Sequence, residues 1–247
     1  MKCVLFGYGK MGKAIEDIAS THGHEVILRI DENNFKDIRP EELSQGDVAF
    51  EFTRPESAYN NIMLCFEAGI PVVCGTTGWL DKFDEIADYC RNNNKSLFYA
   101  TNFSIGVNLF FEVSDKLSKL MNLQPQYDEV LIHESHHSGK LDSPSGTAIT
   151  LAKNMISNLE RLNRWVNYKA DESLDLNSDS DGELPIFSTR EEDVAGTHIV
   201  KYFSDADEIE IIHKAISRAG FAMGAVSAAE WIKGRTGVYG MKDLLKL

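Results

Sequence analysis

The sequence predicts an α/β protein of two domains, in which a doubly wound parallel sheet is followed by an α+β domain with a mostly antiparallel sheet. Three observations lead to this prediction. Short apolar runs alternate with amphipathic segments up to about residue 102, strand candidates then cluster without intervening helices between residues 186 and 213, and an alanine-rich helix follows them. Alternating strands and helices indicate a parallel sheet, whereas clustered strands indicate an antiparallel one.

The first domain is expected to contain five strands connected by helices. The strand candidates are the apolar runs 3–6, 26–30, 48–52, 71–74 and 97–100. A glycine-rich turn over residues 7–12 leads into a helix that ends near His22, and another helix is expected near residues 82–92. Pro55 is expected to open the helix after the third strand, because proline is favoured at the first helical position.

The second half of the chain has a different pattern. Apolar side chains recur at helical spacing between Phe110 and Leu120, which predicts a helix over residues 106–121. The segment 171–183 is acidic and nearly free of large apolar groups, which predicts a solvated loop. The other expected elements are a strand at 129–134, a helix at 147–162, strands at 186–190, 197–203 and 208–213, and a helix at 217–233.

The last predicted helix is rich in alanine, so we expect it to pack closely against the first domain. The predicted domains are therefore residues 1–103 with 217–247, and residues 104–216.

Composition and charge exclude several classes of protein. Of the 247 residues, 43% are apolar and 26% are charged, which is ordinary for a globular protein. The formal net charge of −13 argues against a nucleic-acid-binding protein, which relies on basic patches. No apolar run approaches the ~20 residues that span a bilayer, and no signal-peptide pattern is present, so we expect no membrane association and a cytoplasmic location. The four cysteines form no C-x-x-C pair and are expected to be buried free thiols.

The glycine-rich turn matches the G-x-G-x-x-G pattern of Rossmann-type dinucleotide-binding domains, with a strand before it and a helix after it. Gly7 permits the tight turn, Gly9 lets the backbone approach a pyrophosphate, and Gly12 lets the helix pack closely on the strand. The pyrophosphate is expected on the helix N-terminus, where free N–H groups favour anions. The predicted cofactor contacts of this turn are Gly7, Tyr8, Gly9, Lys10, Met11 and Gly12.

An acidic residue after the second predicted strand bears on the choice of cofactor. Asp31 is expected to accept hydrogen bonds from the hydroxyls of the adenosine ribose. Its carboxylate repels a ribose 2′-phosphate, which favours NADH over NADPH. Arg29, Lys36 and Arg39 are close in sequence and soften this repulsion, so we expect a preference for NADH without strict exclusion of NADPH.

Residues 75–78, Gly-Thr-Thr-Gly, follow the fourth predicted strand. They lie at the carboxyl edge of the sheet, where ligands of open α/β folds bind. The segment is either part of the ligand site or an ordinary turn from a strand to a helix.

A second candidate site falls within residues 133–147. His136, His137 and Lys140 lie within five positions of one another, beside glycine and proline, which is typical of a site loop. Histidine suits acid–base chemistry near neutral pH, and lysine pairs with a carboxylate or supplies a proton.

The end of the same segment opens a predicted helix. The N–H groups of Gly146 and Thr147 form a second anion site there, suited to a carboxylate. Ser145 either belongs to that site or only caps the helix.

The segment also offers a rival interpretation as a zinc protease. Residues 133–137, His-Glu-Ser-His-His, satisfy the H-E-x-x-H motif, which chelates one metal only when it lies on a helix. The preceding Val-Leu-Ile run favours a strand, in which positions four apart are separated by roughly 13 Å. We therefore predict no metal ligands in this segment.

The sequence resembles the 4-hydroxy-tetrahydrodipicolinate reductase family, also called dihydrodipicolinate reductase. The most specific segment is 134–148, Glu-Ser-His-His-Ser-Gly-Lys-Leu-Asp-Ser-Pro-Ser-Gly-Thr-Ala. Further matching segments follow the family's order and approximate spacing, and they are 52–55, 75–78, 102–108 and 213–218. The resemblance therefore covers nearly the whole chain.

The resemblance implies an NAD(P)H-dependent oxidoreductase of lysine and diaminopimelate biosynthesis that reduces a cyclic imine dicarboxylate. It implies that His136 is the general acid/base and Lys140 the proton donor, and that hydride comes from nicotinamide C4. The implied substrate contacts are His137, Gly146 and Thr147, with Ser145 beside them. The implied cofactor contacts beyond the glycine turn and Asp31 are Phe52, Gly75, Thr76, Thr77, Ala100, Thr101, Asn102, Phe103 and Arg218. A homotetramer is also implied, with residues 1–103 and 217–247 as the dinucleotide-binding domain and residues 104–216 as the substrate-binding and tetramerisation domain.

Three positions depart from the usual family pattern. Glu32 stands where an arginine often follows the ribose-binding acid, which strengthens the expected preference for NADH. Glu51 replaces an aspartate, and Thr101 replaces a small apolar residue near the nicotinamide. None of these positions is a proton-transfer residue.

Two other functions are compatible with the same motifs. The first is a different reductase of amino or keto acids on the same scaffold, which substrate screening would separate. The second is a nucleotide-sensing protein that binds a dinucleotide without turnover. The paired histidines and Lys140 argue against a sensor, because a sensor does not need proton donors.

Overall fold

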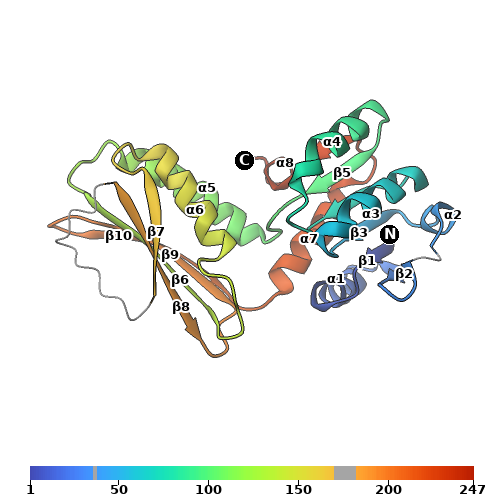
Figure 1. The fold of residues 1–247 in the computed structure, drawn as a ribbon, viewed down its shortest axis with the longest axis horizontal. Coiled ribbons are helices and arrows are strands. Elements are labelled where there is room, and N and C mark those ends of the chain that lie inside the picture. The colour runs from blue at the N-terminus through green and yellow to red at the C-terminus, as the bar shows by residue number, and fades with distance from the viewer. Residues whose placement is uncertain (36–37, 170–181) are drawn as a thin grey trace. The chain divides into compact units, whose positions relative to one another are not determined.

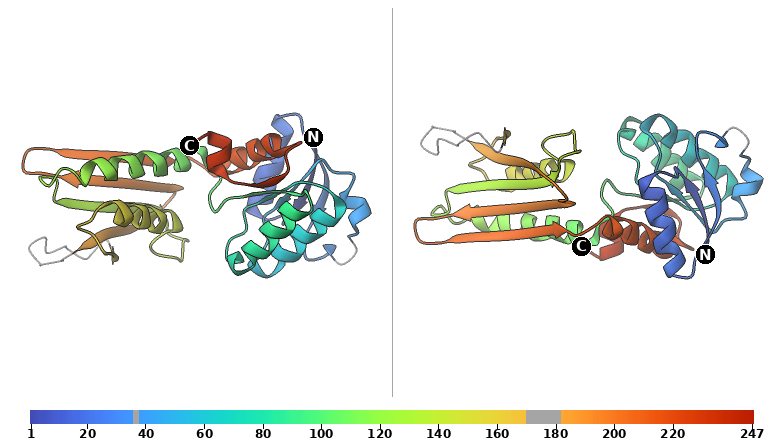
Figure 2. Two further views of the ribbon diagram at one scale, coloured as in Figure 1. Left: turned by 90° about the horizontal axis from the view of Figure 1, so that it is seen from above. Right: turned by 90° about the horizontal axis from the view of Figure 1, so that it is seen from below.

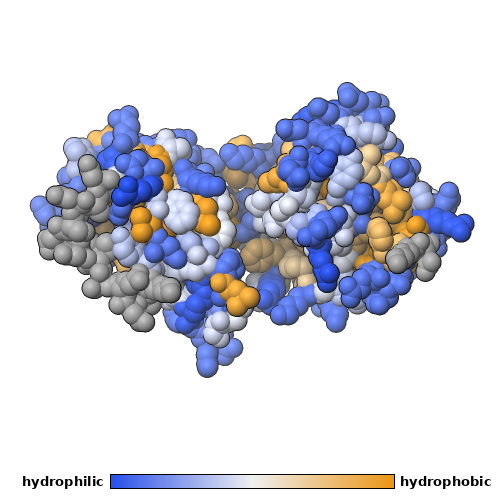
Figure 3. Space-filling view, viewed as in Figure 1, coloured by the Kyte–Doolittle hydropathy of each residue, from blue (hydrophilic) through white to orange (hydrophobic). Residues whose placement is uncertain are grey.

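The computed structural model describes residues 1–35, 38–169 and 182–247, which form two compact units (Figure 1). The first unit contains residues 1–108 and 218–247, and the second contains residues 109–217. Lys36 and residues 171–181 of the expected acidic loop lie outside the described residues. Within the described ranges, no helix combines the length and the apolar character that crossing a bilayer requires. On the side seen in Figure 3, hydrophilic side chains predominate and apolar ones gather in separate patches.

In the described residues, the first unit is built on a sheet of six parallel strands. They are β1 (Lys2–Phe6), β2 (Glu25–Ile30), β3 (Val48–Glu51), β4 (Val72–Cys74), β5 (Ser96–Tyr99) and β11 (Gly237–Tyr239). Their spatial order is β11-β5-β4-β3-β1-β2, and every neighbouring pair runs parallel. The prediction of a doubly wound parallel sheet is confirmed. Strand β11 was not predicted, because three residues are too few to show a pattern.

Helices cover both faces of this sheet (Figure 2). One face carries α1 (Lys10–Thr21), α7 (Ala219–Ile232) and α8 (Met241–Leu245). The other face carries α2 (Pro40–Leu43), α3 (Pro55–Ala68) and α4 (Phe83–Asn92). A 3₁₀ turn, η2 (Leu80–Lys82), directly precedes α4. Successive strand residues enter opposite cores, since Leu5 packs with the first set and Val4 with the second. Burial on both faces explains why the strands are almost continuous apolar runs.

Helix α7 packs tightly on the first unit because its sequence is composed largely of small residues. Gly224 lies directly against the chain after β5, and a Cβ at this position would be 1.8 Å from the carbonyl oxygen of Phe103. The four cysteines are free and buried, as predicted, and they are Cys3, Cys65, Cys74 and Cys90.

The described residues of the second unit form a five-stranded mixed sheet. Its strands are β6 (Glu129–His137), β7 (Arg164–Lys169), β8 (Glu183–Glu191), β9 (Gly196–Phe203) and β10 (Glu208–Ala215), in the order β10-β9-β6-β8-β7. The pairs β10–β9 and β9–β6 are antiparallel, and the pairs β6–β8 and β8–β7 are parallel. Helices α5 (Ile105–Met121) and α6 (Gly146–Asn158) pack in one core with the sheet, which gives the predicted α+β architecture.

Several elements of the second unit differ from the sequence prediction. Strand β8 covers Glu183–Glu191 instead of 186–190, and β10 continues to Ala215 instead of ending at His213. Strand β6 continues to His137 instead of ending at Glu134, because its ladder with β8 extends through the pair His136–Arg190. Helix α6 ends at Asn158 and not at residue 162. Strand β7 was not predicted, since charged and polar side chains interrupt its short apolar alternation.

Candidate functional site

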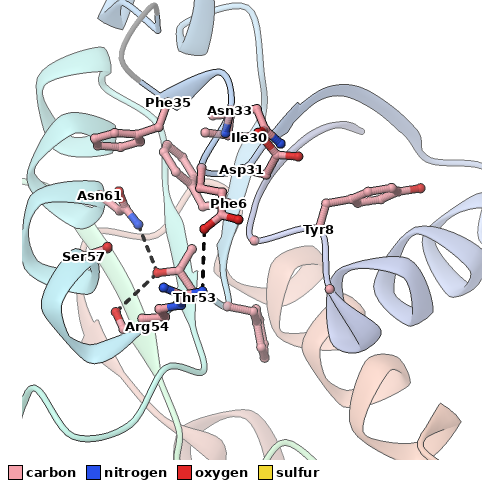
Figure 4. A pocket seen from close by; sticks show the side chains of 14 residues that line it. Phe6, Tyr8, Ile30, Asp31, Asn33, Phe35, Thr53, Arg54, Ser57 and Asn61 are labelled. Atoms are coloured by element: carbon pink, nitrogen blue, oxygen red, sulfur yellow. Dashed lines mark hydrogen bonds and ion pairs between the residues drawn. The ribbon is translucent and has the colours of Figure 1, made fainter.

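A pocket of about 580 Å³ opens at the carboxyl ends of β1, β2 and β3 (Figure 4). Strands β2 and β3 flank β1 on opposite sides, so the pocket lies at the topological switch point, where open α/β sheets bind ligands. Its lining residues are Phe6, Gly7, Tyr8, Gly9, Ile30, Asp31, Glu32, Asn33, Phe35, Phe52, Thr53, Arg54, Ser57 and Asn61. Five of the predicted cofactor contacts are among them, namely Gly7, Tyr8, Gly9, Asp31 and Phe52.

Glycine occurs at the three positions of the turn for different structural reasons. Gly7 has a φ of +92°, and a Cβ there would lie 2.1 Å from the carbonyl oxygen of Phe52. A Cβ on Gly12 would lie 2.1 Å from the carbonyl oxygen of Gly7. Gly9, the N-cap of α1, faces open space, with nothing within 4 Å of such a Cβ. The space above Gly9 and the uncapped N–H groups of α1 therefore fit a pyrophosphate.

Acidic groups dominate the rim of the pocket beside β2. The carboxylate of Asp31 accepts a hydrogen bond from the backbone N–H of Asn33 at 2.8 Å and is exposed. Glu32 Oε2 lies 3.6 Å from Arg54 Nη2. Arg29 is held by an ion pair with Glu16. Of the described residues that line the pocket, Arg54 is the one with a basic side chain. The sequence did not single it out.

Three of the remaining predicted cofactor contacts touch residues that line the pocket. Gly75 lies under the ring of Phe52, where a Cβ would come within 2.2 Å of the ring. Thr76 Oγ1 accepts a hydrogen bond from the backbone N–H of Thr53 at 2.8 Å. The ring of Phe103 packs on that of Phe52, with centroids 5.5 Å apart. The other contacts follow strands or begin helices, and they are Lys10, Met11, Gly12, Thr77, Ala100, Thr101, Asn102 and Arg218.

A buried carboxylate supports the floor of this region. Glu51 is wholly buried at the end of β3. It accepts hydrogen bonds from Asn61 Nδ2 at 3.1 Å and Cys74 Sγ at 3.3 Å, and a short one from the hydroxyl of Thr53. Glu51 therefore joins β3 to α3 and β4.

In the second unit, the predicted histidines lie on a strand and not in a loop. Because β6 runs to its end at His137, the side chains of His136 and His137 point to opposite faces. His136 is buried on the same face as Glu134, and His137 is half-buried on the other face with His133. The helix that the H-E-x-x-H motif needs is therefore not formed here.

Glu134 and His136 form a buried pair. Glu134 has no exposed surface, its Oε2 forms a close ion pair with His136 Nδ1, and its Oε1 lies 3.0 Å from Arg190 Nη1. Burial raises the pKa of Glu134, but the neighbouring His136 and Arg190 outweigh it and bring the pKa to about 2. Glu134 is therefore a carboxylate at neutral pH and fixes the orientation of the His136 ring. Gly196 leaves room for that ring, since a Cβ there would be 3.1 Å from His136 Nε2.

His198 of β9 connects this pair to helix α6. Its ring meets that of His136 edge-on, with centroids 5.1 Å apart, and its Nε2 lies 3.0 Å from Ser145 Oγ. Ser145 caps α6 by accepting the backbone N–H of Ala148 at 3.2 Å. Gly146 begins α6 and has open space around it, so the helix N-terminus is accessible beside the imidazoles.

Lys140 lies in the turn after β6. Its Nζ contacts both carboxylate oxygens of Asp142 at 2.8 Å. Arg190 holds this turn by donating from Nη2 to the Asp142 carbonyl at 2.6 Å and from Nε to the Lys140 carbonyl at 3.4 Å. Arg190 thus joins the turn to Glu134, and Lys140 is placed near His136 by backbone contacts.

Sequence reasoning missed three members of this cluster. Glu134 was noted only as part of the protease motif, although its two-residue spacing from His136 places both on one strand face. Arg190 and His198 come from β8 and β9, more than fifty residues away, and no local pattern identified them.

Acid should destabilise the second unit through His198. Burial and the nearby His136 lower the pKa of His198 to about 3, so the folded protein keeps this imidazole neutral. Its stabilising contribution is present above the unfolded pKa of about 6.5 and is lost as pH falls from there toward 3. Between pH 7 and pH 5 the loss is about 2 kcal/mol. Urea unfolding of wild type and of His198→Gln at both pH values measures this loss of folding free energy. An equal pH dependence in the two proteins would refute its assignment to His198.

Comparisons with known proteins agree over nearly the whole chain. The family model for the N-terminus of dihydrodipicolinate reductase matches residues 1–103, and the model for its C-terminus matches residues 106–245. A 4-hydroxy-tetrahydrodipicolinate reductase of Christiangramia forsetii is 45% identical over 247 residues, covering 99% of this chain and 98% of the relative. One from Neisseria meningitidis serogroup B is 36% identical over 206 residues, covering 83% of this chain and 74% of the relative.

A solved structure shows the same fold. The dipicolinate-bound dihydrodipicolinate reductase of Paenisporosarcina sp. TG-14 superimposes with a TM-score of 0.73 at 22% identity, covering 98% of this chain and 99% of the other. Taken with the two family models and the full-length relative, the chain belongs to the dihydrodipicolinate reductase family.

Proposed function

We propose that this protein reduces 4-hydroxy-tetrahydrodipicolinate to tetrahydrodipicolinate with a reduced nicotinamide nucleotide, as a cytoplasmic enzyme of lysine and diaminopimelate biosynthesis. The observation that carries the proposal is the buried Glu134–His136 pair, which lies beside Lys140 and the open N-terminus of α6. This arrangement combines an oriented imidazole, a cation and an anion site, which are the groups that a cyclic imine dicarboxylate needs.

The N-terminus of α6 is proposed to bind one substrate carboxylate. The N–H groups of Gly146 and Thr147 lie in its first turn, where the helix dipole favours an anion. Lys140 completes the binding site, with Ser145 as the cap that fixes the helix end. The side chain of His137 lies on the opposite face of β6, and its contact with the substrate stays a prediction. In this structure Lys140 pairs with Asp142, whose side chain is 63% exposed. Such an exposed pair is weak, so a substrate carboxylate can replace Asp142 as its partner.

Proton transfer is assigned to His136 and Lys140. Loss of water from the substrate gives a conjugated imine, and reduction at a ring carbon leaves an enamine that must gain a proton. His136 suits this step because Glu134 fixes the orientation of its ring. Lys140 supplies the proton or holds the charge of the adjacent carboxylate.

The nucleotide is proposed to bind at the switch-point pocket of the first unit. When bound, it supplies the hydride. Gly9 and the first turn of α1 receive the pyrophosphate, and Asp31 accepts hydrogen bonds from the adenosine ribose. The packed Phe52, Gly75 and Phe103 form the apolar base of the site next to it.

A coupled assay tests the proposed reaction. Pyruvate and aspartate semialdehyde are condensed by the enzyme that makes the substrate, and loss of NADH is then followed. We expect NADH oxidation that needs both precursors and this protein. Oxidation with other imino or keto acids instead would indicate a different reductase, and tight NADH binding without any turnover would indicate a nucleotide sensor.

Substitutions of two glycines in the turn should have different effects. Gly9→Ala should leave the melting temperature within a degree or two of wild type, because its Cβ meets no atom, yet weaken nucleotide binding by filling the pyrophosphate space. Gly12→Ala should lower the melting temperature, because its Cβ would collide with the Gly7 carbonyl. Calorimetric titration with NADH measures nucleotide affinity, and thermal denaturation measures the melting temperature of each variant. Unchanged NADH affinity in Gly9→Ala would rule out the proposed pyrophosphate position.

NADH is proposed to be the preferred cofactor, with NADPH also accepted. Asp31 and Glu32 place two carboxylates at the ribose end of the pocket, and Arg54 is already paired with Glu32. Changing Glu32 to Arg should raise kcat/KM with NADPH by about tenfold or more, since one like-charge repulsion becomes an attraction. Steady-state kinetics with both cofactors measures the shift. A wild-type preference for NADPH would contradict the assignment.

A homotetramer formed through the second unit is also proposed. Along β9 the side chains alternate between buried and half-buried, so one face of the sheet packs on the helices and the other remains accessible. The accessible face carries Ile199, Phe203 and Ile212, and Ile212 is 56% exposed. Apolar side chains gathered on one sheet face are typical of an interface between subunits. Light scattering on the purified protein measures its mass in solution.

A further inference from the structure

Two histidines and one glutamate converge on the surface of the first unit, away from the nucleotide pocket. His22 is the C-cap of α1, and His24 precedes β2 after one intervening glycine. Glu230 lies in the last turn of α7, about two hundred residues later in the chain. The side chains of His22, His24 and Glu230 are 36%, 12% and 40% exposed, so the cluster is open to solvent on one side.

The three side chains point toward one centre. His22 Nδ1 lies 3.1 Å and His24 Nε2 lies 2.8 Å from the same oxygen, Glu230 Oε1. One ligand atom from each residue falls within 4.8 Å of the other two. Ligand atoms bound tetrahedrally at about 2.0–2.1 Å from zinc are about 3.3 Å apart, which is close to both distances from Glu230 Oε1.

The backbone holds the two imidazoles in place. Gly23 has a φ of +73°, and the turn is closed by hydrogen bonds from the N–H groups of His22, Gly23 and His24 to carbonyls of the last turn of α1. Helices α1 and α7 share one hydrophobic core, in which Ala19 and Ala229 are both buried. A metal would therefore meet a preformed set of ligands, with little ordering left to oppose binding.

The chemistry of the donors limits the choice of ion. We propose that His22, His24 and Glu230 form a binding site for a divalent transition-metal ion of the zinc class, with water in the remaining positions. Imidazole with one carboxylate suits Zn²⁺, Ni²⁺ and Cu²⁺, whereas Mg²⁺ and Ca²⁺ prefer sites made only of oxygen ligands.

The site is structural and not catalytic. It lies at the C-terminal end of α1, whereas the glycine turn lies at the N-terminal end. The twelve residues of that helix, at about 1.5 Å each, separate the two by about 18 Å. A bound ion would join α1 to α7 and so link the returning C-terminal segment to the start of the chain.

Calorimetric titration of the full chain with ZnCl₂, prepared without a polyhistidine tag, tests the proposal. We expect one saturable equivalent of zinc in wild type, its loss in His24→Ala and in Glu230→Gln, and its retention in Glu25→Gln. Glu25→Gln is the matched control, because it removes an exposed carboxylate next to His24 that is outside the cluster. NADH oxidation by all three variants should match wild type.

Thermal denaturation gives a second measurement. Zinc at about 100 times its Kd should raise the melting temperature of wild type by about 5–10 °C and leave Glu230→Gln unchanged, while Mg²⁺ should have no such effect on either. The cluster of Glu134, His136 and His198 in the second unit is the competing location. Zinc binding that persists in a His22→Ala/His24→Ala double variant, or no saturable binding in wild type, would overturn the proposal.

Discussion

His136→Gln and Lys140→Ala should each lower turnover by about 100-fold or more, because each removes a group that we propose to move a proton. His136 is held by Glu134 on one side and meets His198 on the other, so glutamine cannot reproduce both its position and its acidity. Alanine at position 140 removes both a charge and a proton donor. Steady-state kinetics at saturating NADH measures kcat and KM separately for each variant.

Matched controls separate proton transfer from general damage. His133→Gln changes a half-buried histidine on the same strand but on the opposite face, and it should retain near-normal turnover. Lys153→Ala removes an exposed lysine of α6 and should do the same. Lys140→Arg keeps the positive charge but cannot release a proton at neutral pH, so KM should stay near wild type while kcat falls. Wild-type kcat in His136→Gln would remove this residue from the reaction.

Glu134→Gln should impair both stability and turnover. The substitution leaves the guanidinium of Arg190 half-buried without its anion and deprives His136 of its ion-pair partner. Breaking a buried pair in this way costs about 3–5 kcal/mol of folding free energy. Because the ion pair also holds the His136 ring in position, kcat should fall as well, while KM stays near wild type.

Steady-state kinetics at a temperature where the variant is folded distinguishes positioning from a purely structural role. A variant that is only unstable loses active enzyme without changing the kcat of the molecules that remain folded. Glu191→Gln is the matched control, since it makes the same change in an exposed side chain of β8, one residue after Arg190. If folded Glu134→Gln keeps the kcat of wild type, Glu134 does not act through His136.

The fold could be predicted in outline because its strongest signals are local. The strands of the first sheet are buried on both faces, so they appear as apolar runs, and the glycine turn carries its own spacing. Strand β7 and strand β11 could not be predicted, since each is short and is stabilised by pairing with a neighbour that lies elsewhere in the sequence. The end of β6 was misplaced for the same reason, because its ladder with β8 decides where it stops.

The same difference between local and distant contacts decides which residues of the candidate sites could be predicted. His136, Lys140 and the α6 N-terminus lie within one segment and were found together, whereas Arg190 and His198 reach them from β8 and β9. The proposed metal site has the same character, since Glu230 meets His22 and His24 only through the packing of α7 on α1. Contacts between distant segments are set by tertiary packing, which a single sequence does not display.

Transfer of deuterium from labelled NADH tests the central claim most directly. NADH carrying deuterium at the transferable position of nicotinamide C4 is mixed with the protein and the condensation product of pyruvate and aspartate semialdehyde, and the product is analysed by mass spectrometry. With the reaction run in ordinary H2O, the account predicts one deuterium in the reduced ring for each NADH oxidised. Oxidation of NADH that leaves the product unlabelled would contradict it.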